Sequence, residues 1–490
     1  MNEPLIQARL EKLKELREKG IDPYPARFSR SHTIGEVSAR FSFLKEEKQS
    51  GEQVTIAGRL VALRRMGKAS FLDLRDGSGK IQVHASADRL GEERYRELCS
   101  SDIGDFIGVR GDVFRTKMGE LTVEVAEWSL LSKALRPLPE KWHGLKDIEL
   151  RYRHRALDLV ANQAVREAFV LRSRMVSAMH RFLDARDFLE VETPMMQPIA
   201  GGATARPFVT HHNALDIDLY LRVAPELYLK RLVIGGLERV YELGKSFRNE
   251  GVSTKHNPEF TTLEIYEAYS DYEGMMSLVE ELVAESAQAA MGSTRITYQE
   301  NEIDLSLPWR RIGLVQAVEE ATGLSLDGVT ESDIRKQARK KGIELPELSH
   351  GKLIEHLFER FVEPGLIRPT IVKDYPMDIS PLAKRKQGTE GLVERFELFI
   401  GGVEIANAFT ELNDPIDQRA RFEDQERLRE AGDDEAQRMD EDFLFALEHG
   451  MPPTGGIGIG IDRLAMLFSD SFSIRDVILF PTLRAKGARR

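Results

Sequence analysis

The sequence predicts an α+β protein with at least two domains: an N-terminal β-barrel and a larger C-terminal domain built on an antiparallel sheet flanked by helices. The chain has 490 residues, which is too long for a single hydrophobic core. Short strands separated by turn residues fill residues 51–131. Beyond them, pairs of strands joined by short polar or glycine-containing loops alternate with amphipathic helices.

Changes in composition along the chain suggest the domain boundaries. Two prolines, Pro137 and Pro139, predict a semi-rigid, non-helical joint between the domains. We therefore expect an N-terminal helical extension at 1–50, the strand-rich domain at 51–135, a linker at 136–150, and the second domain at 151–490 with a helical insertion at about 311–366.

Composition excludes several classes of protein. With 41% hydrophobic and 30% charged residues and no apolar run of 18 or more, the sequence is typical of a soluble globular protein without a membrane span. The single cysteine, Cys99, excludes an internal disulfide and a cysteine-rich zinc site. Because no cleavable signal is visible, we expect a cytoplasmic protein. The net charge of −11 is a mild argument against a nucleic-acid partner, although local basic patches decide such contacts.

The strand-rich domain has the layout of an OB-fold, a five-stranded barrel that binds single-stranded nucleic acid on an exposed face. Basic Arg64 precedes the aromatic Phe71, and Gln82 lies on the next strand, so phosphate contacts and base stacking are both available. A lone Phe in a strand is more often part of the core. The expected strands are 54–63, 69–76, 80–85, 106–114 and 121–128, with one helix at 91–99.

A charged hairpin in the second domain carries the strongest chemical signal. Residues 239–247 and 259–269 read as strands, and side chains on a strand alternate between its two faces. One face of the second strand therefore presents an aromatic ring, a carboxylate and a phenol, with Arg248 nearby; these residues are Phe260, Thr262, Glu264 and Tyr266. Such groups suit a substrate with phosphate, base and amine parts. The alternative is a solvated face of a surface hairpin.

A glycine-rich segment, 455–460, precedes a short amphipathic helix near the end of the sequence. Its alternating Gly and Ile residues predict a strand that a flat group approaches closely. Arg463 would lie at the helix N-terminus, where the helix dipole and the guanidinium both favour an anion. A dinucleotide-binding fold does not fit, because Arg463 stands where the third glycine of that motif belongs.

Two carboxylates, Glu397 and Glu404, lie on strands predicted at 392–400 and 403–411. Gly401-Gly402 predicts a two-residue hairpin turn, which pairs Phe399 with Glu404 and Glu397 with Ala406. Both carboxylates then share one face, within reach of one hard cation that would relieve their repulsion. The alternative is an ordinary solvated hairpin.

Together these segments resemble the class II aminoacyl-tRNA synthetases, and the lysyl-specific bacterial type most of all. The resemblance runs from about residue 5 to about residue 484. It is carried by a helix and strand at about 165–194, by FRNEG at 247–251 and by GIGIGIDR at 456–463, with further matching strings at 201–208, 222–230, 375–382 and 404–414.

The resemblance implies roles at the nucleotide end of the site. Arg248 and Arg463 would be catalytic, holding the reacting anions and the adenine, and Glu397 with Glu404 would hold Mg²⁺ on the ATP phosphates. Many relatives carry Arg where this chain has Lys255, which leaves the contact at that position open. The implied ATP-binding residues are Arg248, Glu250, His256, Asn257, Phe260 and Arg463.

For the amino acid, the resemblance implies a lysine pocket. The implied residues are Gly202, Glu226, Glu264, Tyr266, Asn407, Phe409 and Glu411. In an undistorted strand, the last three would face away from Glu404, so we expect a β-bulge near residues 405–407. The resemblance also favours Phe71 as an anticodon-stacking residue, with Arg64 and Gln82 beside it.

The resemblance further implies the reaction and its partners: L-lysine, ATP and tRNA(Lys), in a homodimer formed through the helix that carries Leu171, Met175, Met179 and Phe182. Plain core packing is the alternative for that stripe. An aspartyl- or asparaginyl-type enzyme would need a cationic pocket. Enzymes that lysylate proteins or lipids lack this OB-fold or add membrane spans, and a non-enzymatic OB-fold protein would not need the arginine and carboxylate set. The role of the Arg151–Arg155 cluster stays open.

Overall fold

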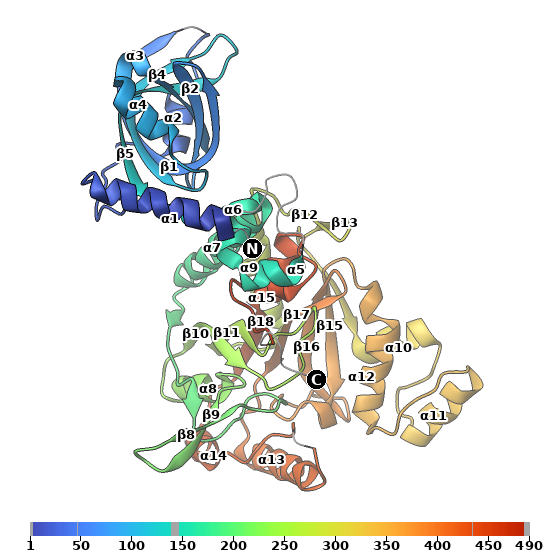
Figure 1. Cartoon of the computed structure of the whole chain (residues 1–490). Coiled ribbons are helices and arrows are strands. Elements are labelled where there is room, and N and C mark those ends of the chain that lie inside the picture. Colours follow the sequence, from blue (N-terminus) through green and yellow to red (C-terminus); the bar gives the residue numbers. More distant parts are fainter. Residues whose placement is uncertain (1–2, 47, 139–146, 434, 485–490) are drawn as a thin grey trace. The chain divides into compact units, whose positions relative to one another are not determined.

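The computed structural model describes residues 3–46, 48–138, 147–433 and 435–484. The chain separates into two compact units, Met1–Leu145 and Lys146–Arg490 (Figure 1). Most of the predicted joint, residues 139–146, lies outside the described residues. Among the described residues, no helix is long and apolar enough to cross a membrane.

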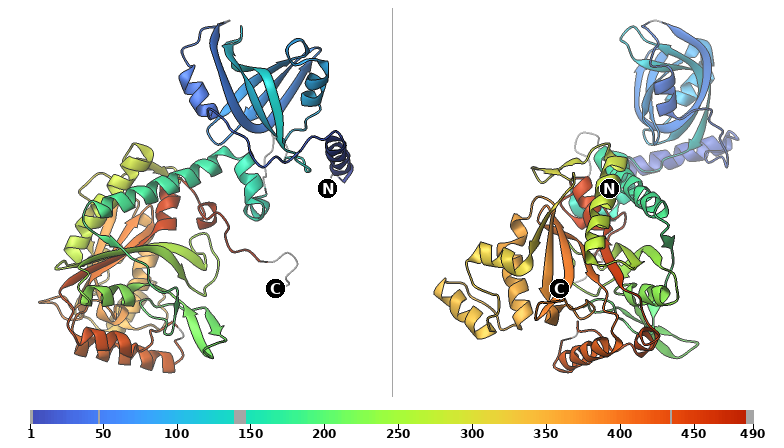
Figure 2. Two further views of the ribbon diagram at one scale, coloured as in Figure 1. Left: turned by 90° about the vertical axis from the view of Figure 1, so that its left-hand side faces the viewer. Right: turned by 180° about the vertical axis from the view of Figure 1, so that it is seen from behind.

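The N-terminal unit is a closed five-stranded barrel with strand order β1-β2-β3-β5-β4 (Figure 2). The strands are β1 Gln49–Met66, β2 Ala69–Arg75, β3 Lys80–Ser86, β4 Phe106–Arg115 and β5 Leu121–Ser132; the helices are α1 Glu3–Glu18, α2 Ile34–Arg40, α3 Ala87–Leu90 and α4 Glu92–Cys99. Closure leaves no exposed sheet edge. The barrel encloses one core, to which Leu72 and Val83 belong, and the predicted OB-fold is confirmed.

The C-terminal unit is organised around an eight-stranded sheet with order β14-β15-β16-β17-β18-β11-β10-β6. Its strands are β6 Leu189–Glu190, β10 Arg239–Phe247, β11 Glu259–Ala268, β14 Arg310–Gly313, β15 Thr370–Pro376, β16 Leu392–Ile400, β17 Val403–Thr410 and β18 Thr454–Gly460. The six central strands are antiparallel, and only the edge strands β14 and β6 pair in parallel. The predicted α+β class is confirmed.

Three helices cover one face of this sheet: α7 Gln163–Asp184, α9 Tyr272–Met291 and α15 Ile461–Phe468 (Figure 2). Side chains from these helices and from the strands form one core. Met175, Met179 and Phe182 of α7 are buried in it, and Leu171 packs against it. The apolar stripe of α7 is therefore core packing within this chain, which was the alternative interpretation of that pattern.

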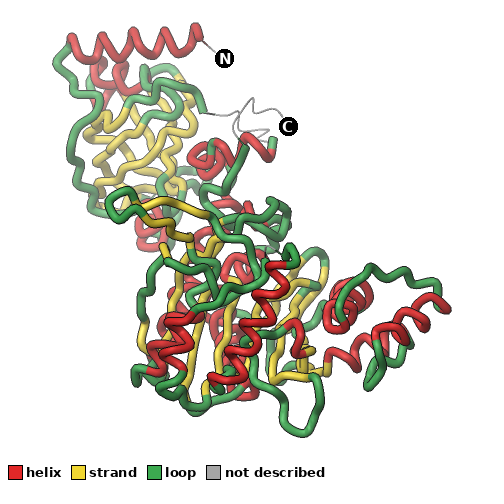
Figure 3. Tube along the Cα trace, turned by 90° about the horizontal axis from the view of Figure 1, so that it is seen from below, coloured by secondary structure: helices red, strands yellow, loops and turns green. Residues whose placement is uncertain are grey.

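The helical insertion lies between β14 and β15 and projects at that edge of the sheet (Figures 1 and 3). It contains α10 Leu314–Thr322, α11 Glu331–Lys340 and α12 His350–Phe361, followed by η1 Glu363–Gly365. These helices pack their apolar faces onto β15 and β16 in a separate cluster that includes Val318, Leu357 and Phe399. The first turns of α12 thereby reach the face of the sheet that α7, α9 and α15 do not cover.

The opposite face of the sheet is bordered by α8 Glu226–Ile234, α13 Pro415–Glu430 and α14 Glu441–Leu447. Asp414 caps α13 by accepting hydrogen bonds from the backbone N–H groups of Ile416 and Asp417, and Pro415 opens that helix. The remaining elements are α5 Ile148–Arg153, α6 Arg155–Ala161, β7 Met196–Gln197, β8 Val209–His212, β9 Ile217–Leu221, β12 Arg295–Tyr298, β13 Asn301–Asp304, η2 Met377–Ile379 and η3 Ile474–Asp476.

Two arginines of the 151–155 cluster make contacts that stabilise the fold. The Arg155 guanidinium is fully buried, pairs with Asp158 at 2.7 Å and donates to the carbonyl oxygens of Arg475 and Leu479. Arg151 reaches the same Asp158 at 3.0 Å. These contacts tie α5 and α6 to the segment after α15.

Candidate active site

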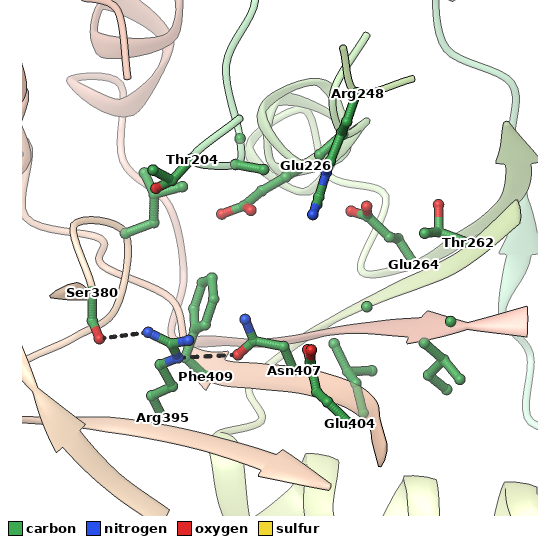
Figure 4. Close-up of a pocket in the computed structure, with 18 of the residues that line it drawn as sticks. Thr204, Glu226, Arg248, Thr262, Glu264, Ser380, Arg395, Glu404, Asn407 and Phe409 are labelled. Atoms are coloured by element: carbon green, nitrogen blue, oxygen red, sulfur yellow. Dashed lines mark hydrogen bonds between the residues drawn. The ribbon is translucent and has the colours of Figure 1, made fainter. Parts of the chain in front are cut away.

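A cavity of about 430 Å³ opens on the face of the sheet that α7, α9 and α15 leave uncovered. Strands β11, β16, β17 and β18 form its floor, and α8 and the 202–204 segment border it (Figure 4). Every residue that the sequence assigned to ATP or lysine lines this cavity: Gly202, Glu226, Arg248, Glu250, His256, Asn257, Phe260, Glu264, Tyr266, Asn407, Phe409, Glu411 and Arg463. Of the two expected metal ligands, Glu404 lines it, whereas Glu397 does not line it but lies opposite Asn407, which does.

Two guanidinium groups mark one end of the cavity. Arg248 follows β10, and its charged end lies 5.1 Å from the centre of the Phe260 ring. Burial lowers the pKa of Arg248, and its Nε has no hydrogen-bond partner. Arg463, on the first turn of α15, donates to the Glu404 carboxylate at 2.8 Å and lies 3.3 Å from His256 Nε2. This end can hold an anionic group beside an aromatic plane.

His256 and Asn257 hold the loop between β10 and β11 in place. Burial, reinforced by the Arg463 charge, lowers the pKa of His256, which favours the neutral ring. The Asn257 side-chain amide donates to the carbonyl oxygen of Glu259 at 2.6 Å, and its own oxygen is buried without a donor. That oxygen is available to a donor on a ligand.

Glu397 and Glu404 lie near one another on β16 and β17. Burial raises the pKa of Glu397 to about 7, an effect that Arg395 opposes and the neighbouring Glu404 charge adds to. Burial acts to raise the pKa of Glu404, but the guanidinium groups around it, Arg463 foremost, together outweigh burial and lower the pKa. Glu397 accepts from the Tyr375 hydroxyl at 2.9 Å and from Arg395 at 2.6 Å. Within the described part of the chain, no three His, Cys, Asp or Glu side chains gather closely enough to hold a metal by themselves.

The strand β17 contains the expected bulge. Phe399 pairs with Glu404 as predicted, but Leu398 pairs with Ala406, so Ile405 has no partner on β16. The predicted pairing of Glu397 with Ala406 is therefore wrong by one residue, and Glu397 faces Asn407. Ile405 and Ala406 both enter the core, and beyond them the alternation continues with the opposite phase. As a result Glu404, Asn407, Phe409 and Glu411 all line the same cavity.

The other end of the cavity is rich in buried carboxylates. Burial raises the pKa of Glu264 to about 8, and the Glu226 charge adds to this shift. Burial likewise holds the pKa of Glu411 well above its ordinary value, and the Glu411 Oε1 lacks a hydrogen-bond donor. The Tyr266 hydroxyl donates to Glu264 at 3.2 Å. Buried carboxylates that outnumber the cations beside them favour a cationic ligand.

Glycines make room for these side chains. Gly202 has φ +89°, and a Cβ atom there would lie 3.0 Å from the Glu226 Cβ. A Cβ on Gly456 would meet the Glu411 carboxylate and would lie 2.6 Å from the Tyr266 ring. The glycine-rich strand β18 therefore provides the floor over which Glu411 and Tyr266 extend.

Two buried cations of the site were not identified from the sequence. Lys230, one turn after Glu226 on α8, pairs with Glu226 at 2.6 Å and also with Glu411. Arg395 donates to Glu397, and at 3.1 Å to the Asn407 side-chain oxygen (Figure 4). The spacing could have indicated both, because residues four apart on a helix and two apart on a strand share a face.

In the N-terminal unit, the three expected nucleic-acid contacts share the outer face of the barrel. Arg64 pairs with Phe71 across β1 and β2, and Phe71 pairs with His84 on β3, with ring centres 5.0 Å apart. Phe71 is half-buried and does not belong to the barrel core. Gln82 lies two residues from His84 and accepts from the Thr122 hydroxyl at 3.0 Å. The platform therefore combines a guanidinium, two rings and an amide.

Comparison with known proteins agrees with both units. The family model of class II tRNA synthetases (D, K and N) matches residues 147–484, and that of the OB-fold nucleic acid binding domain matches residues 54–131. The chain is 57% identical to the lysine–tRNA ligase of Moorella thermoacetica over 484 residues, which cover 98% of each chain. It is 54% identical to that of Bacillus subtilis over 485 residues, covering 98% and 97%. The chain therefore belongs to the class II tRNA synthetases of the D, K and N group.

Proposed function

We propose that this chain is a lysine–tRNA ligase, which joins L-lysine to ATP as lysyl-adenylate with release of pyrophosphate and then transfers lysine to the 3′ end of tRNA(Lys). Family membership and the lysine–tRNA ligase relatives support the reaction. The observation that carries the choice of lysine is Glu411, a fully buried carboxylate that lines the cavity; its Oε2 pairs with Lys230, whereas its Oε1 has no hydrogen-bond donor.

An aspartate- or asparagine-specific pocket is disfavoured by the same residues. Recognising a substrate carboxylate requires a free cation, and Lys230 is already held between Glu226 and Glu411. Glu264 adds a third carboxylate at this end. In the lysine complex, Glu411 and Tyr266 would receive the ε-ammonium. The α-ammonium would be held by Glu226, Glu264 and the Gly202 backbone, and Asn407 and Phe409 would line the same pocket.

At the other end, Arg248 would place the lysine carboxylate against the α-phosphate of ATP. An oxygen of that carboxylate attacks phosphorus, the bond to the β-phosphate oxygen breaks, and pyrophosphate leaves. Arg248 reduces the repulsion between the two anions, and the adenine would stack between Phe260 and Arg463. Glu250, His256 and Asn257 would order the loop around the phosphates.

The residues present fit Mg²⁺. Glu397 and Glu404 supply hard oxygen donors, and a cation would stabilise the ionised form of Glu397, whose pKa is raised by burial and, to a smaller extent, by the Glu404 charge. Two protein carboxylates completed by phosphate oxygens are a common way to bind this ion. When bound, Mg²⁺ would neutralise charge on the leaving pyrophosphate.

The barrel would bind the anticodon, with a base stacked on Phe71, Gln82 at a base edge and Arg64 near a phosphate. We further propose that the enzyme works in the cytoplasm as a homodimer. A reducing compartment suits a chain whose single cysteine, Cys99, is buried and free.

The test is ATP–pyrophosphate exchange with purified protein and each of the twenty amino acids in turn. We expect exchange with lysine to exceed exchange with every other amino acid, and to require Mg²⁺. A stronger response to aspartate or asparagine, or none to lysine, would overturn the proposed function.

A further inference from the structure

Lys230 is a fully buried cation beside the carboxylates at the amino-acid end of the cavity. Its side chain is fully buried on α8, and its ammonium pairs with Glu226 at 2.6 Å and with Glu411. The Phe409 ring centre lies 5.3 Å from the same nitrogen. These contacts join three elements of the pocket: α8, the end of β17, and the residue after β17.

The other charged groups around Lys230 have their own partners. From β16, Arg395 pairs with Glu397 at 2.6 Å. Arg222, just before α8, pairs with Glu242 of β10 at 2.5 Å. From β11, Glu264 and Tyr266 contact each other rather than Lys230. Lys230 is therefore the cation that faces the carboxylates of this end of the cavity.

The number of charges at this end matches a substrate with two ammonium groups. Glu226, Glu264 and Glu411 supply three carboxylates, and Lys230 supplies one ammonium, so ionised side chains leave two negative charges. Lysine carries two positive groups besides its carboxylate. A buried charge without a partner is costly, so a third unmatched carboxylate would weaken binding.

We propose that Lys230 is a positioning residue that fixes Glu226 and Glu411 and matches the net charge of the amine-binding end to the two ammonium groups of the substrate. This inference rests on the proposed function. Lys230 touches neither ATP nor the reacting atoms in this scheme. It acts through the two carboxylates, which would otherwise repel each other across the pocket.

Loss of the Lys230 charge should therefore make lysine binding depend on pH in a new way. Lys230→Met keeps the length of the side chain but leaves three carboxylates facing two ammonium groups. At low pH, a proton on the surplus carboxylate replaces the missing positive charge. At high pH the surplus carboxylate of the variant is ionised before lysine binds. Lysine binding then has to take up a proton from solution, so the affinity for lysine falls as pH rises.

The experiment measures the KM for lysine and for ATP in pyrophosphate exchange from pH 6.5 to 8.5, for the full-length wild type and for Lys230→Met. At pH 8.5 we expect the lysine KM of the variant to be about tenfold or more above wild type, with the ATP KM changed less than about twofold. The ratio of the two lysine KM values should fall steadily toward pH 6.5. Lys336→Met, on the exposed part of α11, is the matched control and should resemble wild type.

A second variant separates charge matching from folding. Glu226→Gln combined with Lys230→Met removes one anion and one cation together. Replacing both members of a buried ion pair by neutral side chains destabilises a protein far less than removing one member alone. Its lysine KM is expected to rise by a factor that does not change with pH. Thermal unfolding of each variant is followed in parallel.

The possible results separate the two proposals. A wild type without lysine-dependent exchange would overturn the proposed function. An active wild type, with a Lys230→Met effect that is absent or equal at every pH, would overturn the role of Lys230. If Lys230→Met does not fold, the double variant provides the test. A ratio of its lysine KM to that of the wild type that rises with pH would also overturn the role of Lys230.

Discussion

Burial of acidic side chains, more than any other residue-level property, determines what the cavity can bind. Glu264 and Glu411 are both buried, and burial raises the pKa of both. A cationic ligand stabilises the ionised form of these buried carboxylates by supplying a positive charge beside them. Burial also raises the pKa of Glu397, and a bound metal cation would stabilise its ionised form.

The raised pKa of Glu264 predicts a pH dependence of lysine activation. Its pKa of about 8 means that the free enzyme holds this carboxyl largely protonated at pH 7. As pH rises toward 8 the group ionises and can pair with an ammonium, so kcat/KM for lysine should rise and then level off. The measurement is pyrophosphate exchange at limiting lysine. With lysine saturating, kcat/KM for ATP should lack this limb, and a flat lysine profile between pH 6.5 and 8 would contradict the assignment.

Glu411→Gln should remove selectively the response to lysine. The substitution leaves the ε-ammonium without its anion, which costs roughly 3–5 kcal/mol for a buried pair. Lysine-dependent exchange should collapse, whereas ATP binding measured by equilibrium titration should persist. Glu423→Gln, on the exposed side of α13, serves as the control. Equal loss of ATP binding would remove Glu411 from the lysine pocket.

At the scale of elements, one inserted residue in β17 assembles the site. Without the bulge at Ile405, the strand could place either Glu404 or Asn407 in the cavity, but not both. The sequence indicated this conflict, because residues with expected roles fell on opposite faces of a regular strand. It could not locate the bulge more closely than 405–407, since Ile405, Ala406 and Ala408 are all compatible with the core.

The barrel face yields a prediction for Phe71→Ala. Because Phe71 lies on the outer face beside His84, its loss should weaken aminoacylation of tRNA(Lys), with a base stack worth about 1–3 kcal/mol. Lysine-dependent exchange should be unchanged. Aminoacylation of an anticodon-mutant tRNA should respond less than that of the wild-type tRNA. Phe43→Ala, at an exposed position outside the barrel strands, is the control, and a tenfold fall in exchange by Phe71→Ala would show that Phe71 acts in the fold.

For the whole molecule, apolar side chains left exposed near the start of the large sheet support the proposed homodimer. They are Val170 on α7, Leu189 on β6, and Met195 and Met196 just beyond it. The buried stripe of α7 is not available for such a contact, since it packs within the chain. Exposed apolar side chains that form one patch are typical of interaction surfaces.

Sedimentation should therefore give a mass near twice 55.5 kDa. Leu189→Arg should shift the protein toward monomer and lower exchange, because a buried charge would disrupt the contact. Met118→Arg, at an exposed apolar side chain in a barrel turn, should leave the mass unchanged. A wild-type monomer with full lysine-dependent exchange would exclude an obligate dimer.

The residues expected in the cavity followed from the resemblance to the class II synthetases. The two-part organisation, the barrel and the hairpins were determined by the sequence itself, because strand alternation and turn chemistry are local properties. Even the turn at Gly401–Gly402 follows from them, with φ +64° and +69°. Only the tertiary structure decided the exact register of Glu397, the core role of the α7 stripe, and the pairing of Lys230 with Glu411. Those depend on contacts between segments distant in sequence, where burial sets the cost of every charge and packing decides which face of an element is covered.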